Sequence, residues 1–168
     1  TYLELGGKNS AIVSRKANLK LAIKEIVKGI FENGGQACVG ISRLIVHKEI
    51  YKKFIKDLIL NIKKRYEEDQ LILQVPANKI QKRKIEKQIN FIKKKYKNKI
   101  LKIFNLGSSK FTPIFLYLNN SDNYFINTEF FFPIVTIETF QDLKEAININ
   151  NISKFGLAAY TFTNSKKE

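Results

Sequence analysis

The stretch LKLAIKEIVKGIFENGGQACVGISRLIVH, residues 19–47, decides the fold class of this 168-residue chain. Its apolar residues first recur at i, i+3, i+4 and i+7, the spacing of an amphipathic helix, over residues 19–31. Asn18 can cap the start of this helix, and Asn33–Gly34–Gly35 is a common signal for its end. The run SRLIVH, residues 42–47, then predicts a buried strand. Helix, glycine turn and buried strand together predict one unit of an α/β protein.

The rest of the chain continues this alternation of helices and strands. Further helices are expected at 50–62, along the stripe of Ile85, Ile89, Ile92 and Tyr96, and after Asp142, which precedes Glu145 in a capping-box pattern. Further strands are expected at 10–13, 100–104, 112–118, 134–140 and 157–163. Residues 66–79 show no regular pattern. Without an internal repeat or a long linker, the chain is expected to form a single α/β domain with a largely parallel sheet.

Composition and charge set wider limits on function. The net charge is +15, and residues 79–102 hold eleven Lys or Arg against one Glu, which is typical of proteins that bind nucleic acid or an anionic surface. Lys, Asn, Ile and Phe are abundant together, however, and AT-rich codons favour all four. We therefore favour a genome-wide composition bias, and a basic binding module is the alternative.

The single cysteine and the hydropathy indicate where the protein works. One cysteine cannot form an internal disulfide, and no apolar run approaches the ~20 residues that span a bilayer. The first residues, TYLELGGKNS, lack the features of a signal peptide, so a cytoplasmic location without membrane contact is expected. Because the chain does not begin with Met, it is expected to be a fragment or a processed piece.

Cys38 is the first candidate for chemistry, because it follows two glycines in the turn between a helix and a strand. A free cysteine is commonly a small buried hydrophobe, but a turn at this place could also present a nucleophilic thiolate. His47 is the obvious base for a Cys–His pair. The two residues are nine positions apart, which spans on the order of 30 Å when extended, so a Cys–His hydrolase is not expected.

Glu4 is the second candidate, because LELGG places it between leucines and beside a predicted tight turn at Gly6–Gly7. A carboxylate that loses part of its hydration there would hold a proton more readily, which suits a general base. The alternative is an ordinary half-exposed strand residue. Cys and His do not cluster, so no metal site is expected, and the chain has neither a P-loop nor a GxGxxG motif.

Two motifs, taken in order, resemble the catalytic domain of the NAD(P)-dependent aldehyde dehydrogenases. LELGGK occupies residues 3–8, and F-x-N-x-G-Q-x-C-x-x-x-S-R-x-x-V runs through residues 31–46. Glu4 and Cys38 are 34 residues apart, which is the spacing expected in that family. Later segments similar to family motifs follow in the family's order, at 111–116, 128–140 and 154–163. The resemblance thus covers almost the whole chain.

The resemblance implies a fold and a set of partners. It implies a three-layer α/β catalytic domain with a largely parallel sheet, incomplete at both ends, over residues 1–168. The cofactor-binding Rossmann domain of the family is absent from these residues. An aldehyde substrate, the rest of the enzyme as a separate chain or missing part, and a homo-oligomer are the partners implied.

The resemblance also implies a mechanism. Cys38 would attack the aldehyde as a thiolate, the thiohemiacetal would pass hydride to NAD or NADP, and Glu4 would activate water to hydrolyse the resulting thioester. Glu129 would contact the nicotinamide-side ribose, Phe131 would pack near the cofactor, and Gly6 would lie close to the nicotinamide.

Two departures from the family pattern accompany the resemblance. Phe132 replaces the glycine of F-G-P, where the backbone is expected to turn freely, and QVPANKI, residues 74–80, lacks the glycine of the usual G-P-L segment. An inactive folded remnant is therefore an alternative to the active fragment.

Overall fold

The computed structural model describes residues 5–68, 76, 78–104, 112–118 and 122–168, and Glu4 lies outside them. A six-stranded sheet forms the centre, in the order β3-β4-β5-β2-β1-β6. All neighbouring strands are parallel except β3 and β4. The strands are β1 Asn9–Val13, β2 Ile41–His47, β3 Ile100–Ile103, β4 Ile114–Tyr117, β5 Ile134–Phe140 and β6 Ala159–Phe162. The predicted α/β class with a largely parallel sheet is confirmed.

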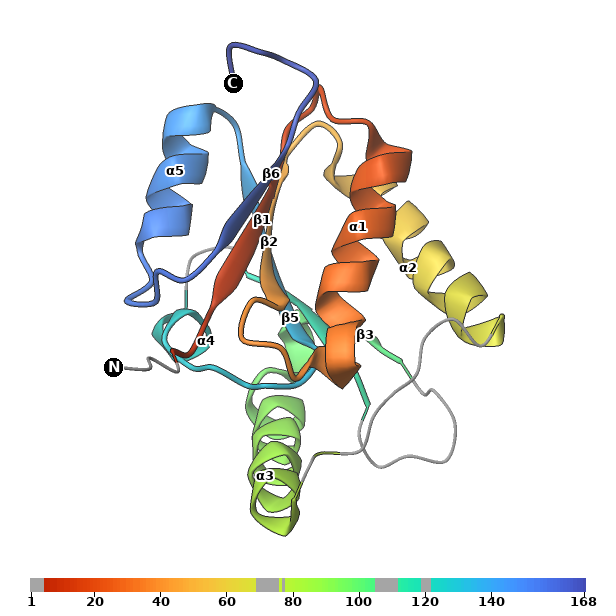
Figure 1. The fold of residues 1–168 in the computed structure, drawn as a ribbon, viewed down its shortest axis with the longest axis vertical. Coiled ribbons are helices and arrows are strands. Elements are labelled where there is room, and N and C mark those ends of the chain that lie inside the picture. The colour runs from red at the N-terminus through yellow and green to blue at the C-terminus, as the bar shows by residue number, and fades with distance from the viewer. Residues whose placement is uncertain (1–4, 69–75, 77, 105–111, 119–121) are drawn as a thin grey trace.

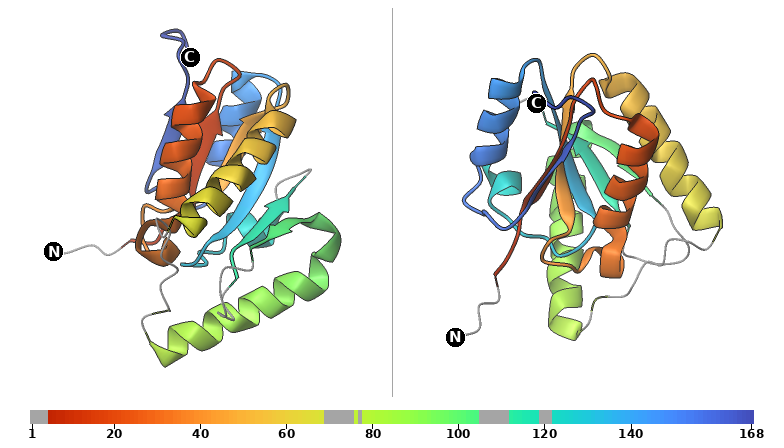
Figure 2. Two further views of the ribbon diagram at one scale, coloured as in Figure 1. Left: turned by 90° about the vertical axis from the view of Figure 1, so that its right-hand side faces the viewer. Right: turned by 45° about the horizontal axis from the view of Figure 1, so that its top comes forward.

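Helices cover both faces of the sheet (Figure 1). They are α1 Leu19–Phe31, α2 Tyr51–Glu67, α3 Lys79–Lys95, α4 Asn123–Ile126 and α5 Leu143–Asn151, with short 3₁₀ turns η1 Glu32–Gly35 and η2 Lys97–Lys99. α1 and α2 pack side by side on one face, and α5 lies on the other. Figure 2 shows the same layers from two further sides, with α3 crossing beneath one end of the sheet. The strands therefore lie between two helical layers.

The alternation of side chains along the strands explains this layering. Ala11 and Val13 belong to the apolar core beneath α1 and α2, whereas Ile12 packs on the opposite side with Ala146 of α5. The two predicted N-caps are confirmed as well. The Asn18 side chain accepts a hydrogen bond from the Leu21 N–H, and Asp142 accepts one from the Glu145 N–H.

Two elements differ from the sequence prediction. α2 continues to Glu67 although its apolar period ends earlier, because its last turns hold Lys, Arg and Glu, which favour helix without needing burial. α4 was not predicted, since four residues are too few to show a period. Asp122 caps this helix by accepting a hydrogen bond from the Tyr124 N–H at 2.9 Å.

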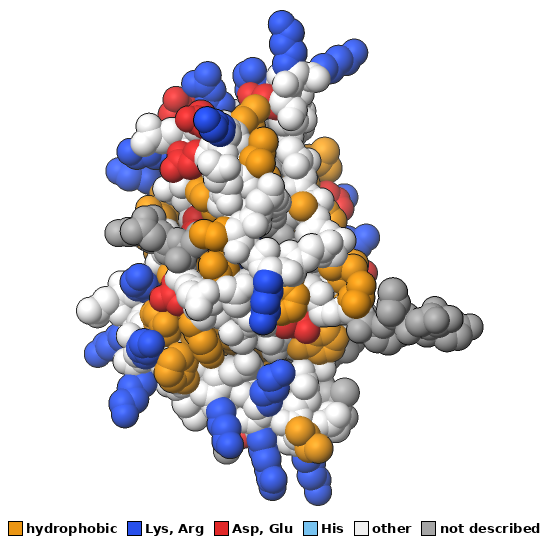
Figure 3. All heavy atoms as spheres, turned by 90° about the vertical axis from the view of Figure 1, so that its left-hand side faces the viewer, with side chains coloured by type: hydrophobic (Ala, Val, Ile, Leu, Met, Phe, Trp, Pro, Cys, Tyr) orange, Lys and Arg blue, Asp and Glu red, His pale blue; other side chains and the backbone are white. Residues whose placement is uncertain are grey.

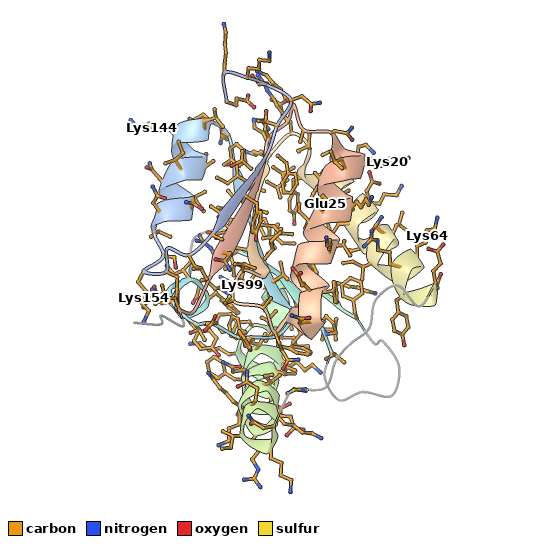
Figure 4. The ribbon with its side chains drawn as sticks, viewed as in Figure 1. Lys20, Glu25, Lys64, Lys99, Lys144 and Lys154 are labelled. Carbon is orange, nitrogen blue, oxygen red and sulfur yellow. The ribbon has the colours of Figure 1, made fainter. Side chains whose placement is uncertain are left out.

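The basic helix α3 uses its apolar stripe for packing. Ile85, Ile89 and Ile92 lie buried in a cluster with residues of β4, β5 and α4. Lys and Arg side chains stand along the top and left-hand margins of the face in Figure 3, and several gather at its lower end. In Figure 4, Lys20, Lys64 and Lys144 point outward from three different helices. This spread over many elements is the pattern that a composition bias predicts.

No helix within the described ranges has the length and apolar character needed to cross a membrane.

Candidate active site

Four segments far apart in the sequence meet at one end of the sheet. β5, β2, β1 and β6 are neighbours and run parallel, so their amino-terminal ends form a single edge. The segments that enter these strands are 129–133, 32–40, 5–8 and 157–158. Three of them carry predicted site residues: Glu129 and Phe131, Cys38, and Gly6. The edge lies at the lower end of the sheet in Figure 1.

The segment that carries Cys38 is a sharp reversal followed by a β-turn. Asn33, Gly34 and Gly35 adopt the left-handed conformation, with φ of 49°, 67° and 78°. The chain then turns over Ala37–Gly40, closed by a hydrogen bond of 2.9 Å from the Gly40 N–H to the Ala37 carbonyl. Cys38 takes the second position of this turn and is exposed. The alternative that Cys38 is a buried hydrophobe is therefore wrong.

Gly35 is needed for both its conformation and its small size. Its φ of 78° is strained for any L side chain, and a Cβ there would lie 2.5 Å from Cδ of Pro133. Pro133 belongs to the segment entering β5, and Gly35 to the segment entering β2. The absence of a side chain at Gly35 thus lets these two segments pack against each other beneath the Cys38 turn.

We expect Gly35→Ala to lower the free energy of unfolding by about 3 kcal/mol. The left-handed conformation accounts for ~1–2 kcal/mol, and the clash with Pro133 for a similar amount. Urea denaturation followed by circular dichroism measures the change. Gly156→Ala is the matched control, because a Cβ there meets nothing within 4 Å. Equal stability of the two variants would contradict this role of Gly35.

Gly6 and Gly7 do not form the predicted tight turn. Neither has a positive φ, and residues 5–8 are irregular without a turn. Because these glycines have no side chain, other segments of the chain can approach their backbone closely. A Cβ on Gly6 would lie 2.6 Å from Oε2 of Glu129, and a Cβ on Gly7 would lie 2.2 Å from the Cys38 carbonyl oxygen. The Gly7 N–H also donates to Oε1 of Glu129 at 2.7 Å. The structure therefore brings Gly6, Glu129 and the Cys38 turn together.

The free backbone turn expected at position 132 occurs one residue earlier, at Phe131. Phe131 has φ 55°, whereas Phe132 has no positive φ and is buried against the α3 cluster. The reason is Pro133, because a residue before proline is restricted to extended backbone. The bulky side chain at Phe132 therefore occupies the core, and the left-handed conformation falls on the half-buried Phe131.

Lys8 carries a buried amine that the sequence did not single out. It is 3% exposed, and its Nζ lies 4.3 Å from the centroid of the Phe130 ring. Among the described residues, this Nζ has no hydrogen-bond partner. Burial, assisted by the positive charge of Arg43, lowers the pKa of Lys8 from 10.5 to about 7, although Glu129 and Glu138 act in the opposite direction.

This pKa makes the stability of the protein depend on pH. Between pH 7 and 10.5 the unfolded chain binds a proton at Lys8 that the folded chain has released, so stability rises with pH across that window. We expect the free energy of unfolding of the wild-type chain to rise with pH more steeply than that of Lys8→Met. The difference in slope should be on the order of 1 kcal/mol per pH unit. Denaturation midpoints measured across the window test this difference. Parallel pH profiles for the two proteins would contradict it.

Arg43 and Glu138 form a buried ion pair that sequence reasoning also missed. The Arg43 guanidinium lies 3.3 Å from Oε1 of Glu138, with the side chains 1% and 4% exposed. It also donates to the carbonyls of Ile149 and Asn150, at 2.6 and 3.2 Å, near the end of α5. The pair thereby fixes the end of α5, from which the chain runs to β6. The sequence signal for this pair was one charged residue of each sign, each within an otherwise apolar run that predicts a strand.

His47 lies at the far end of β2 from Cys38, as the sequence predicted. It is buried, packs edge-on against Phe140 at 5.2 Å, and accepts a hydrogen bond at Nδ1 from the Glu49 N–H. His47 therefore takes no part in this site. Nowhere in the described ranges do three His, Cys, Asp or Glu side chains gather as a metal site would require.

The surface at Gly6 fits the contact that a nicotinamide cofactor would make. Gly6 is exposed and carries no side chain. Oε2 of Glu129 lies beside it, whereas Oε1 of the same carboxylate accepts the hydrogen bond from the Gly7 N–H. By contrast, the small cavity between the Cys38 turn and residues 129–132 has a volume of about 20 Å³, enough for roughly one water. This cavity is too small to admit a cofactor ring, whereas the backbone at Gly6 is exposed.

Solved structures of aldehyde dehydrogenases share this architecture. The crystal structure of lactaldehyde dehydrogenase from Escherichia coli aligns over 98% of this chain and 36% of its own, with 26% identity and a TM-score of 0.81. Among sequences, lactaldehyde dehydrogenase of Methanococcus maripaludis is 35% identical over 97% of this chain. The mitochondrial succinate-semialdehyde dehydrogenase of Oryza sativa is 34% identical over 97% of this chain.

The model of the aldehyde dehydrogenase family matches residues 1–168. The chain belongs to this family. It spans about a third of the length of the curated relatives, 36% of the Methanococcus protein and 32% of the Oryza protein.

Proposed function

We propose that this chain is the catalytic part of an enzyme that oxidises an aldehyde to a carboxylate, with Cys38 as nucleophile and Glu4 as general base. The exposed Cys38 in its β-turn is the observation that carries this proposal. The turn packs against Gly7, whose N–H is bonded to Glu129. Family membership and the fold support the same reaction.

In this proposal each residue has a separate task. The Cys38 thiolate attacks the carbonyl carbon of the aldehyde, and the Cys38 backbone N–H helps to hold the oxyanion. After oxidation the acyl group is held as a thioester on Cys38, and Glu4 takes a proton from the water that hydrolyses it. NAD or NADP, when bound, supplies the hydride acceptor. Glu129 would accept a hydrogen bond from the ribose of this cofactor, Phe131 would pack near it, and the exposed backbone of Gly6 would lie close to the nicotinamide.

A complete aldehyde dehydrogenase also needs a cofactor-binding domain and subunit contacts. We propose that residues 1–168 act as one catalytic domain, and that further polypeptide supplies the cofactor-binding domain and the contacts of a homo-oligomer. The coverage of about a third of the relatives supports this division. A single exposed thiol as nucleophile requires reducing conditions, which supports a cytoplasmic location.

An activated ester tests the proposal without requiring the cofactor. In p-nitrophenyl acetate, attack by the Cys38 thiolate on the carbonyl releases nitrophenolate and leaves an acetyl thioester on Cys38. We expect a burst of one nitrophenolate per chain, followed by slow turnover as the thioester is hydrolysed. Mass spectrometry should find the acetyl group on Cys38. The absence of both burst and acetylated Cys38 would overturn the proposed function.

A further inference from the structure

Asn9 connects the Cys38 turn to the sheet. Its side chain is buried, and Nδ2 donates to the carbonyl oxygens of Cys38 at 2.7 Å and Gly40 at 3.0 Å. Its Oδ1 accepts a hydrogen bond of 3.0 Å from the Ala158 N–H, just before β6. The amide of Asn9 therefore joins the first residue of β1 to the segments that enter β2 and β6.

The turn is anchored through three consecutive carbonyls. Asn9 holds those of Cys38 and Gly40, and the Tyr160 hydroxyl donates to the carbonyl between them, Val39, at 3.0 Å. Gly7 makes this possible, because a Cβ there would lie 2.2 Å from the Cys38 oxygen and 2.6 Å from Nδ2 of Asn9. The backbone of the turn is thus drawn toward β1 and β6, while Cys38 itself is exposed.

An anchored carbonyl constrains the thiol next to it. Peptide groups are planar, so a fixed Cys38 carbonyl fixes the plane of the peptide that follows Cys38. The Gly40 carbonyl fixes the other end of the turn in the same way. The Cα–Cβ bond of Cys38 then has a set direction, and only rotation about χ1 remains free for the thiol.

We propose that Asn9 is a positioning residue for Cys38: by holding the Cys38 and Gly40 carbonyls, it aims the thiol at the substrate carbonyl. This inference rests on the proposed role of Cys38 as nucleophile. The side chain suits the task, because an amide supplies two N–H donors and one carbonyl acceptor, and Asn9 uses all three hydrogen bonds.

Asn9→Asp tests the proposal most directly. The carboxylate has the same shape and can still accept from the Ala158 N–H, but it cannot donate to either carbonyl. We expect the rate constant of the nitrophenolate burst to fall by ~10²-fold, because a nucleophile displaced by about 1 Å loses this much. Alkylation of Cys38 by iodoacetamide should change by less than about threefold, since a small electrophile can approach an exposed thiolate from many directions.

Two further variants separate positioning from stability. Ser10→Ala removes a partly buried side-chain hydrogen bond to Asn150 from the neighbouring position of β1, away from the Cys38 turn. It should lower the melting temperature and leave the burst rate unchanged. Asn9→Ser serves if the aspartate variant does not fold, because a hydroxyl can replace only one of the two donated bonds. We expect it to slow the burst by ~10-fold, as a partial loss of the same anchor.

The outcomes distinguish this inference from the proposed function. A folded Asn9 variant with the wild-type burst rate overturns the positioning role and leaves the nucleophile intact. If Ser10→Ala slows the burst as much as an Asn9 variant does, the positioning role is also overturned. The slower burst would then reflect lower stability alone. A wild-type chain without any burst overturns the proposed function, and the positioning role with it.

Discussion

Replacing Cys38 by alanine should abolish the burst of nitrophenolate from p-nitrophenyl acetate. No other described residue combines a nucleophilic side chain with exposure at this turn, and alanine cannot form a thioester. Any remaining hydrolysis should match the rate of the ester in buffer. Stopped-flow absorbance measures the burst, and mass spectrometry of the intact chain should show no added acetyl group.

The fold should survive this substitution. The Cys38 side chain is exposed, and the hydrogen bonds of the turn come from backbone groups that alanine keeps. We therefore expect the free energy of unfolding to change by less than about 0.5 kcal/mol. A burst that persists in a folded Cys38→Ala variant would show that another side chain is acylated. It would also remove the basis for the proposed reaction.

Changing Glu4 to glutamine should have a different effect, because it acts on the second half of the reaction. The burst should keep its amplitude, since Cys38 is intact. The slow turnover that follows should fall by ~10²–10⁴-fold, which is the usual contribution of a positioned general base. Acetylated chain should then accumulate and be visible by mass spectrometry during turnover.

Glu25→Gln provides the control for loss of a negative charge. Glu25 projects from α1 (Figure 4) and lies outside the four segments that form the site. Its substitution should leave both the burst and the turnover unchanged. Wild-type turnover in Glu4→Gln would show that water is activated by another group, and Glu4 would lose its proposed role.

Local patterns in the sequence predicted most of the fold. The period of α1 and the apolar run of β2 depend only on neighbouring residues, as do the caps at Asn18 and Asp142. The family motifs also pointed to Cys38, Gly6 and Glu129, which the structure brings to one edge of the sheet. The role of each in catalysis is still a prediction.

The features that the sequence did not reveal depend on contacts between distant segments. The glycines Gly6 and Gly7 suggested a turn, but their partners lie at Glu129 and Cys38, and no local rule indicates this. The ion pair of Arg43 and Glu138 requires the neighbouring strands β2 and β5 to be aligned. The burial of Lys8 likewise follows from packing against Phe130, far along the chain.

The anchor at Asn9 also links the chemistry to the order of folding. The Ala158 N–H, which Asn9 binds, and Tyr160, which binds the Val39 carbonyl, both belong to the part of the chain that enters or forms β6. A polypeptide made from its amino terminus produces β6 more than a hundred residues after the cysteine. Asn9 and the Cys38 turn are thus synthesised early, whereas the hydrogen bonds from Ala158 and Tyr160 that complete the anchor become available only after β6 has been made.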